Sequence, residues 1–352
     1  MKYKRSLSIS ILLALSFMMT IFTVIYIVDP YMIFHKKIFY KNKMSPNLRI
    51  QNYGLIKFEN FDSIIMGTSM LENTSADEAS AKLNSTFANL SISGGSFYEK
   101  FLILNYAIKT KKIKNIILSL DFKFEIDGEI NNTFLPQLYN NDSVLSKFSA
   151  YLNTNAMKCI FWGYCELKDI DLDHSSAWYK NGEHMRRFGG FNKWLEYRNS
   201  DTQIKQAFID LKSEKFMSNI NFEKGKKIID TEILPLFQNS NVQFNIIIPP
   251  YSILWWAKAD DYSKILEIYG YFIEQASLFY NVSVYWFYDE DFVLDVANYK
   301  DLTHYHQSFN SLQLDAIKHK NNIINGKNYK AKFNEWTNSI ETFDLDFYLN
   351  QI

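Results

Sequence analysis

Short apolar runs alternate with helix-like segments along much of this chain, and this alternation constrains the fold more than any other feature. Residues 63–67, 86–93 and 115–122 have the apolar content of buried strands, and residues 75–83 and 97–110 between them have the spacing of helices. Apolar strands that alternate with helices are typical of a parallel sheet covered on both faces. The sequence therefore predicts an α/β fold.

The alternation stops near residue 123 and resumes near residue 226. Residues 123–225 are aromatic, rich in Asn and irregular, with helical pieces at 141–152 and 201–212. The elements expected after them are a helix at 226–237, a strand at 242–250, a helix at 261–280 and a strand at 282–287. One α/β domain at 38–325, with a large insertion after its third strand and a helical extension at 326–352, explains this order better than two domains.

An uncharged run, residues 6–28, follows the basic start MKYKR at the N-terminus. As a helix it is long enough to cross about 30 Å of hydrocarbon. A cleaved signal peptide would have a shorter apolar region and a small-x-small cleavage site, whereas this run ends in VDPYMIF. We expect residues 1–37 to form a cytoplasmic tip and a transmembrane anchor that stays attached.

Basic residues flank the anchor on both sides, with Lys2, Lys4 and Arg5 before it and Lys36, Lys37, Lys41 and Lys43 after it. The positive-inside count therefore leaves both orientations open. Basic residues lie tight against the N-terminal end only, and this favours an N-terminus inside and a main domain outside the cytoplasm. We therefore expect a single-pass protein of the cytoplasmic membrane.

The sequence has two cysteines, Cys159 and Cys165. Without further cysteines or neighbouring histidines they do not make a zinc site, which needs four ligands. In an oxidising compartment they would close a short disulfide loop, and in a reducing one they would be buried thiols. Of the two alternatives we favour the disulfide.

Charge and motifs exclude several classes of function. Lys plus Arg and Asp plus Glu number 38 each, so no net charge draws the protein to nucleic acid. The glycines at 93–96 and 189–191 lack the P-loop lysine and the dinucleotide spacing, and no HExxH metal motif occurs. We expect no nucleic-acid partner, no metal and no cofactor.

Ser69 lies just past the end of the first expected strand, in the sequence GTS. In open parallel sheets, ligands bind at the carboxyl ends of the strands, so a serine at this place is available for chemistry. The alternative is that Thr68, Ser69 or Asn73 caps the following helix.

A serine nucleophile needs a base, and His304 follows the last expected strand. Asp301 precedes it by three residues, a spacing that can place a carboxylate beside the imidazole and fix its tautomer. The alternative is that Asp301 starts a turn and His304 is exposed.

The stretches GTS, NLSISG at 89–94 and DLTH together resemble the first, second and fifth blocks of the SGNH or GDSL-like hydrolase superfamily. The resemblance covers residues 61–124 and 241–325. It implies a flavodoxin-like three-layer α/β/α sandwich.

The same resemblance implies a role for each matching residue. Ser69 would be the nucleophile, His304 the base and Asp301 the residue that orients it, with the amides of Ser69 and Gly94 in the oxyanion hole. The family's third block supplies an oxyanion asparagine, and here Asp121 stands near that place. Since an ionised carboxylate would repel an oxyanion, Asp121 could be protonated, another donor such as Asn73 could serve, or the site could be degenerate.

The GTS form with an N-terminal anchor looks closest to membrane-tethered SGNH-like proteins of bacterial envelopes. These include accessory proteins of teichoic acid D-alanylation and of exopolysaccharide O-acetylation, several of which work beside a membrane-bound O-acyltransferase. The resemblance therefore implies a serine O-acyltransferase, transferring acetyl groups, or an esterase, acting on an envelope glycan with an acyl donor. The alternative is a non-catalytic scaffold that assists a membrane-bound O-acyltransferase or holds a polymer.

Overall fold

The computed structural model describes residues 2–38, 44–45, 47–121, 131, 133–141, 143–163, 187–239 and 241–352. The chain divides into two compact units. The first contains Met1–Asn60 and Asn132–Asp171, and the second contains Phe61–Asn131 and Leu172–Ile352. Residues of the expected insertion therefore belong to both units.

A mixed sheet forms the centre of the second unit, and in the described part of the chain it has six strands in the order β2-β1-β3-β4-β5-β6. The strands are β1 (Ser63–Met66), β2 (Phe87–Asn89), β3 (Asn115–Ser119), β4 (Gln243–Ile247), β5 (Val282–Tyr285) and β6 (Ile323–Ile324). β1 to β5 are parallel, and β6 pairs antiparallel with β5. The predicted α/β class and parallel sheet are confirmed, with β6 as an edge strand too short to show a sequence period.

The strand order places a switch point between β1 and β3. The chain leaves β1 toward β2 on one side, and β3 leads toward β4 on the other, so a crevice opens at the carboxyl ends of β1 and β3. All four residues of β1 are buried, as are four of five in β3 and in β4. Burial along the whole strand explains why these strands are continuous apolar runs.

The second strand is shorter than expected because side chains replace part of its ladder. Beyond Asn89 the amides of Leu90 and Ile92 still bond to carbonyls at the end of β1. The amide of Ser91 instead bonds to the Asn89 side chain, and the Ser91 hydroxyl accepts from the amide of Gly67. These bonds tie the turn after β1 to the segment after β2.

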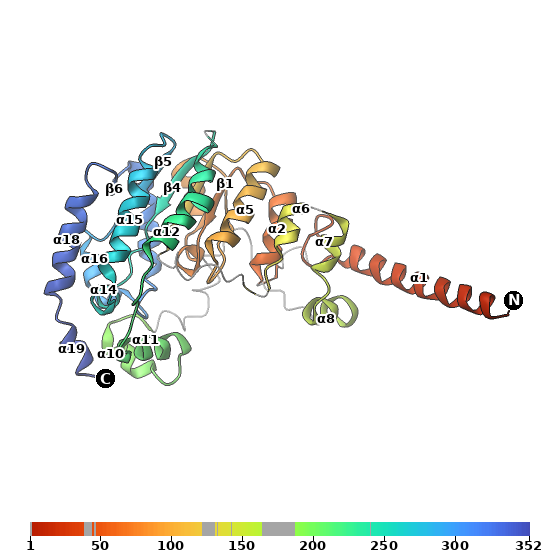
Figure 1. Ribbon diagram of the computed structural model, residues 1–352, viewed down its shortest axis with the longest axis horizontal. Helices are drawn as coiled ribbons and strands as arrows, with labels where there is room; N and C mark the ends of the chain where they lie inside the picture. Colours follow the sequence, from red (N-terminus) through yellow and green to blue (C-terminus); the bar gives the residue numbers. More distant parts are fainter. Residues whose placement is uncertain are drawn as a thin grey trace. The chain divides into compact units, whose positions relative to one another are not determined.

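Helices of the second unit pack along the sheet and on one another, and α5, α12 and α15 lie side by side in front of the sheet in Figure 1. Their bounds, among the described residues, are α3 (Ser69–Glu72), α4 (Ala76–Leu83), α5 (Phe97–Thr110), α10 (Phe191–Tyr197), α11 (Thr202–Lys212), α12 (Phe222–Ile228), η3 (Ile229–Ile233), α13 (Leu234–Phe237), α14 (Ile253–Lys258), α15 (Tyr262–Ala276), α16 (Asp291–Leu294), η4 (Val296–Asn298), α17 (Gln307–His319), α18 (Tyr329–Thr342) and α19 (Leu345–Leu349). The helix expected at 226–237 contains the π-helical turn η3 because Pro235 has no N–H to donate to the preceding turn.

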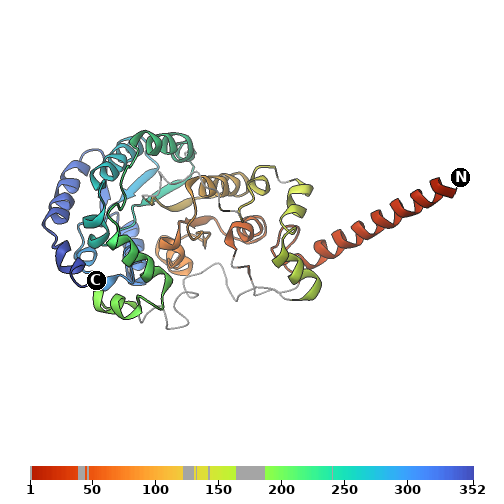
Figure 2. The same ribbon diagram turned by 60° about the horizontal axis from the view of Figure 1, so that its bottom comes forward.

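The first unit contains the N-terminal helix α1 (Lys2–Val28) and four shorter helices, within the residues the structure describes. These are α2 (Leu48–Phe58), α6 (Pro136–Asn141), α7 (Val144–Ser149) and α8 (Thr154–Trp162). α1 is long and apolar enough to cross a membrane, and Figure 2 shows it projecting from α7 and α8. Cys159 is buried in α8, whereas Cys165 lies outside the described residues, so the bridge between them stays a prediction.

Candidate active site

In the turn after β1, the helix cap is Thr68 and not Ser69. Thr68 is the N-cap of α3, and its hydroxyl accepts a hydrogen bond from the amide of Met70. A Cβ on Gly67 would lie 2.7 Å from the Cβ of Leu71, so only glycine fits this tight turn. Ser69 is the first residue of α3, with its side chain at the carboxyl end of β1.

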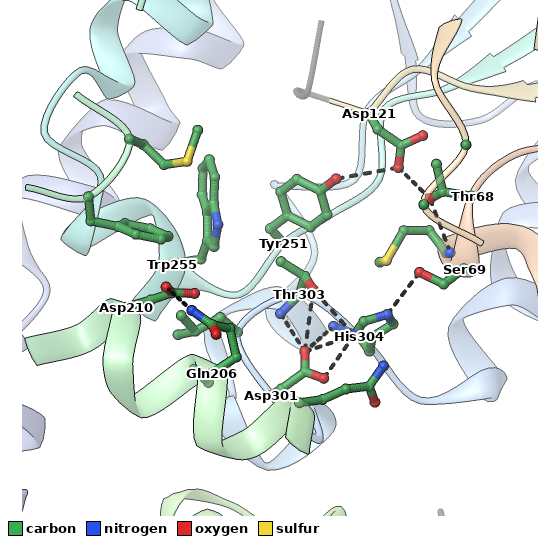
Figure 3. A pocket seen from close by; sticks show the side chains of 18 residues that line it. Thr68, Ser69, Asp121, Gln206, Asp210, Tyr251, Trp255, Asp301, Thr303 and His304 are labelled. Atoms are coloured by element: carbon green, nitrogen blue, oxygen red, sulfur yellow. Dashed lines mark hydrogen bonds and ion pairs between the residues drawn. The ribbon is translucent and has the colours of Figure 1, made fainter. Parts of the chain in front are cut away.

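Ser69, His304 and Asp301 form a continuous hydrogen-bonded relay (Figure 3). The Ser69 Oγ lies 2.9 Å from the His304 Nε2, and the His304 Nδ1 lies 2.8 Å from the Asp301 Oδ2. Asp301 Oδ1 also accepts from the amides of Thr303 and His304, both at 2.9 Å. Because Asp301 accepts from Nδ1, Nε2 is left to accept the proton of the Ser69 hydroxyl.

Asp301 is ionised although it is 4% exposed. Burial alone would raise the pKa of this carboxyl, but the charge and hydrogen bonds of His304 and the charge of Lys300 hold it well below its usual range. Burial lowers the pKa of Lys300, whose Nζ donates to the Gln203 Oε1 over 2.8 Å. The loop that carries Asp301 and His304 is therefore fastened to α11.

Asp121 accepts four hydrogen bonds at the carboxyl end of β3. Its Oδ1 accepts from the hydroxyls of Thr68 at 2.9 Å and Tyr251 at 3.3 Å. Its Oδ2 accepts from the Ser119 hydroxyl at 2.6 Å and the Lys100 ammonium at 3.2 Å. With all four partners donating, both oxygens act as acceptors, as an ionised carboxylate requires.

The charge of Asp121 is compensated by Lys100 within the protein interior. Burial would raise the pKa of Asp121, but the charge of Lys100 and the hydrogen bonds from Ser119 and Thr68 outweigh it and lower the pKa. The side chains of Asp121 and Lys100 are 4% and 1% exposed. Of the three interpretations left open by the sequence, a protonated Asp121 does not fit this geometry.

Backbone amides at the site offer donors for an oxyanion. Among the described residues, none accepts a hydrogen bond from the amide of Ser69 or of Gly94. Gly94 lines the cavity in a left-handed conformation, with a φ of 59°. Asn73 follows α3 and is not among the described residues that line the cavity. Gly94 therefore lies at the cavity with an amide that can donate, and its oxyanion role stays a prediction, whereas Asn73 lies outside the cavity.

A cavity of about 480 Å³ opens in front of Ser69 and His304. Its remaining wall includes side chains that sequence reasoning missed: Gln203, Gln206 and Asp210 of α11, with Phe216, Met217, Tyr251 and Trp255 (Figure 3). The three polar residues of α11 follow the spacing i, i+3, i+7, which places them on one helix face. That spacing was the available signal, although nothing in it indicates which face meets the site.

Two residues near the relay have structural roles. His306, two residues after His304, accepts from the Ser308 amide and is the N-cap of α17. The side-chain amide of Asn89 donates to the carbonyls of Leu71, at 2.8 Å, and Thr74, at 2.9 Å, so it fastens the end of α3. The stretch NLSISG at 89–94 thus holds α3, the short helix that begins at Ser69, in place.

The site has the chemistry of a serine nucleophile. A hydroxyl bonded to an imidazole, which is itself oriented by an ionised carboxylate, is the arrangement that activates serine for attack. Among the described residues, no group of three His, Cys, Asp or Glu side chains could hold a metal ion. No protein-family model matches this chain, and no curated protein matches it.

Proposed function

We propose that this chain is a membrane-anchored serine O-acyltransferase or esterase of the SGNH-like type that acts on a cell-envelope polysaccharide. The observation that carries the proposal is the relay of 2.9 Å from Ser69 to His304 and 2.8 Å from His304 to Asp301. The fold that the proposal implies is a flavodoxin-like three-layer sandwich with residues 123–225 inserted after its third strand. The order of the five parallel strands, 2-1-3-4-5, supports that fold.

Acylation begins when the Ser69 Oγ attacks the carbonyl carbon of an acyl donor. The hydroxyl proton moves to the His304 Nε2 as the new C–O bond forms, and the carbonyl oxygen becomes an oxyanion. The amides of Ser69 and Gly94 donate to that oxyanion. The bond to the leaving oxygen then breaks, His304 returns the proton to it, and Asp301 remains ionised throughout.

Deacylation repeats these steps with a second nucleophile. A water or a glycan hydroxyl attacks the acyl group on Ser69, and His304 takes its proton. The new ester or acid is released while the proton returns to the Ser69 Oγ. With water as the second nucleophile the protein is an esterase, and with a glycan hydroxyl it is a transferase.

Asp121 acts in this mechanism through Thr68 and without protonation. Its bond to the Thr68 hydroxyl fixes the residue before the nucleophile, and Lys100 compensates its charge. The oxyanion is therefore not opposed by an unbalanced carboxylate.

The cavity wall supports a glycan as the acceptor. Gln203, Gln206 and Asp210 can exchange hydrogen bonds with sugar hydroxyls, while Trp255 and Phe216 offer apolar surface to a sugar ring. A cavity of about 480 Å³ accommodates a small sugar unit with its acyl group.

A non-catalytic scaffold is the second candidate. The observation that favours it is Asp121, an ionised side chain where the SGNH resemblance implies a neutral oxyanion donor. Such a protein would hold an envelope polymer or assist a membrane-bound O-acyltransferase. Its Ser69 would be dispensable.

Turnover of a chromogenic acetyl ester by the detergent-solubilised full chain tests the enzyme. We expect Ser69→Ala to abolish turnover. Ser75→Ala is the matched control, because Ser75 caps α4 and does not line the cavity. It should cost about 1 kcal/mol of stability and leave turnover unchanged. Full acylation of the envelope glycan in cells that carry Ser69→Ala would favour the scaffold.

The proposed topology has the N-terminus inside and residues from about 35 onward outside the cytoplasmic membrane. It is supported by the apolar helix α1 and by the basic residues tight against its N-terminal end. Alkaline phosphatase and a cytosol-only reporter, fused in parallel after residue 60, test it. Activity of the cytosolic fusion alone would refute the topology.

A further inference from the structure

The first unit covers α1 only near its C-terminal end. Residues 3–20 are exposed, whereas Ile25 is fully buried. Ile25 lies within the uncharged run at 6–28, so the segments that bury it reach past the end of the apolar helix.

Helix α7 makes the clearest of these contacts. The ring of Phe148 lies 4.5 Å from the ring of Phe22 and 4.7 Å from that of Phe34. Phe22 precedes the end of α1, at Val28, by six residues, or about 9 Å along the helix axis. If the end of the apolar run marks the boundary of the hydrocarbon, α7 contacts the anchor on the hydrocarbon side of that boundary.

Helices α7 and α8 and the turn between them also expose large apolar side chains. The α7–α8 apolar surface consists of Val144, Leu145, Leu152, Phe161 and Trp162. Leu145 is 80% exposed and Trp162 66% exposed. Apolar surface of this kind is unfavourable in water and marks an interaction site.

We propose that the α7–α8 apolar surface inserts into the lipid bilayer at the boundary between headgroups and acyl chains, beside the anchor. The inference rests on α1 spanning the membrane. A depth of about 9 Å agrees with the 5–10 Å to which interfacial helices are buried. Trp162 has the amphipathic ring enriched at that level, and the exposed Lys158 of α8 can reach lipid phosphates.

Two attachments restrict the first unit more than one helix does. A single transmembrane helix leaves the segment that follows it free to rotate and tilt. Insertion of α7 and α8 fixes that unit against one leaflet. Asp29 also holds the segment directly after α1, because its carboxylate accepts hydrogen bonds from the amides of Ile33, Phe34 and His35.

Tryptophan fluorescence reads the insertion directly. Trp162 is the exposed tryptophan among the described residues, and α1 contains none. The full chain, carrying Trp178→Phe to remove a tryptophan outside the described residues, is reconstituted in phosphatidylcholine–phosphatidylglycerol vesicles. We expect lipids brominated near the headgroup to quench the emission of Trp162 more than lipids brominated deep in their acyl chains.

Variants separate insertion from anchoring. Trp162→Phe should lose this quenching, whereas Trp194→Phe, at a fully buried position of the second unit, should keep it. Leu145→Glu with Leu152→Glu should lower the quenching while the chain still floats with the vesicles. A chain that floats with vesicles but shows no quenching of Trp162 would overturn the proposal and point to a protein partner. A chain that does not float would refute the anchor itself, and the insertion with it. Neither result bears on Ser69.

Discussion

Replacing Lys100 with Met should destabilise the protein by leaving the Asp121 charge buried and unbalanced. Lys100 Nζ lies 3.2 Å from the Asp121 Oδ2, and both side chains are almost fully buried. Breaking a buried ion pair by removing one partner costs roughly 3–5 kcal/mol. Since the hydroxyls of Thr68, Ser119 and Tyr251 still donate to Asp121, we expect a loss near the lower end, about 3 kcal/mol.

The size of this loss should depend on pH, because Lys100 sets the direction of the Asp121 pKa shift. In the wild type the folded-state pKa lies below the ordinary value of 3.8, so the carboxylate stabilises the fold above that value. Its contribution is lost as the pH falls through the folded-state pKa. In Lys100→Met, burial dominates and the folded-state pKa rises above the ordinary value. The contribution of Asp121 to the stability of the variant is then greatest at low pH and is lost as the pH rises.

The difference in unfolding free energy between wild type and Lys100→Met should therefore grow from about pH 4 to pH 7, by up to about 1.4 kcal/mol per pH unit. Urea unfolding of the detergent-solubilised full chain, followed by tryptophan fluorescence, measures it. The matched control is Lys114→Met, because the Lys114 side chain is 66% exposed in its pair with Asp62. It should cost less than about 1 kcal/mol.

The double variant Lys100→Met with Asp121→Asn should be more stable than Lys100→Met alone, because it removes the unbalanced charge. A Lys100→Met variant that unfolds like Lys114→Met at every pH would refute the buried ion pair. A difference in unfolding free energy between wild type and Lys100→Met that shrinks as the pH rises would refute it as well.

Three further substitutions test the surroundings of the relay. Asp301→Asn should reduce ester turnover about 10⁴-fold, since the amide cannot hold the tautomer of His304. Because the pKa of Asp301 is lowered in the fold, the unfolding free energy of this variant should also fall less than that of the wild type between about pH 5 and pH 2. Gly67→Ala should cost about 1–3 kcal/mol and most turnover, read by urea unfolding and the ester assay, because its Cβ would lie 2.7 Å from that of Leu71. His306→Ala should cost about 1 kcal/mol as a lost helix cap, and an unchanged turnover rate would separate it from His304.

The parallel sheet and its order of elements were predictable from sequence because apolar runs and helical spacing are local signals. The helix expected at 97–110 is α5, Phe97–Thr110, where Ser96 and Glu99 form a capping box. Strand ends were less predictable. Beyond Asn89 the Ser91 hydroxyl accepts from the amide of Gly67, and these two residues, 24 positions apart in the sequence, come together only in the fold.

The relay was predictable as a set of residues, since GTS follows β1 directly and DLTH lies between β5 and α17, but not as a geometry. Lys100 illustrates what local patterns miss. It lies on α5 among apolar positions, and no sequence spacing relates it to Asp121, whose carboxylate it meets only after β3 and α5 pack. Likewise, Gln203 and Asp210 belong to the irregular region of the sequence, and the fold brings them to the cavity.

Covalent labelling of Ser69 tests the central claim most directly. A fluorophosphonate probe reacts with a serine only when a neighbouring base activates it. We expect the full chain to gain one adduct, located at Ser69 by peptide mass spectrometry, and expect Ser69→Ala and His304→Ala to lose it while Ser75→Ala keeps it. A folded wild-type chain with no adduct at Ser69, or a Ser69→Ala variant labelled as fast as the wild type, would contradict the account.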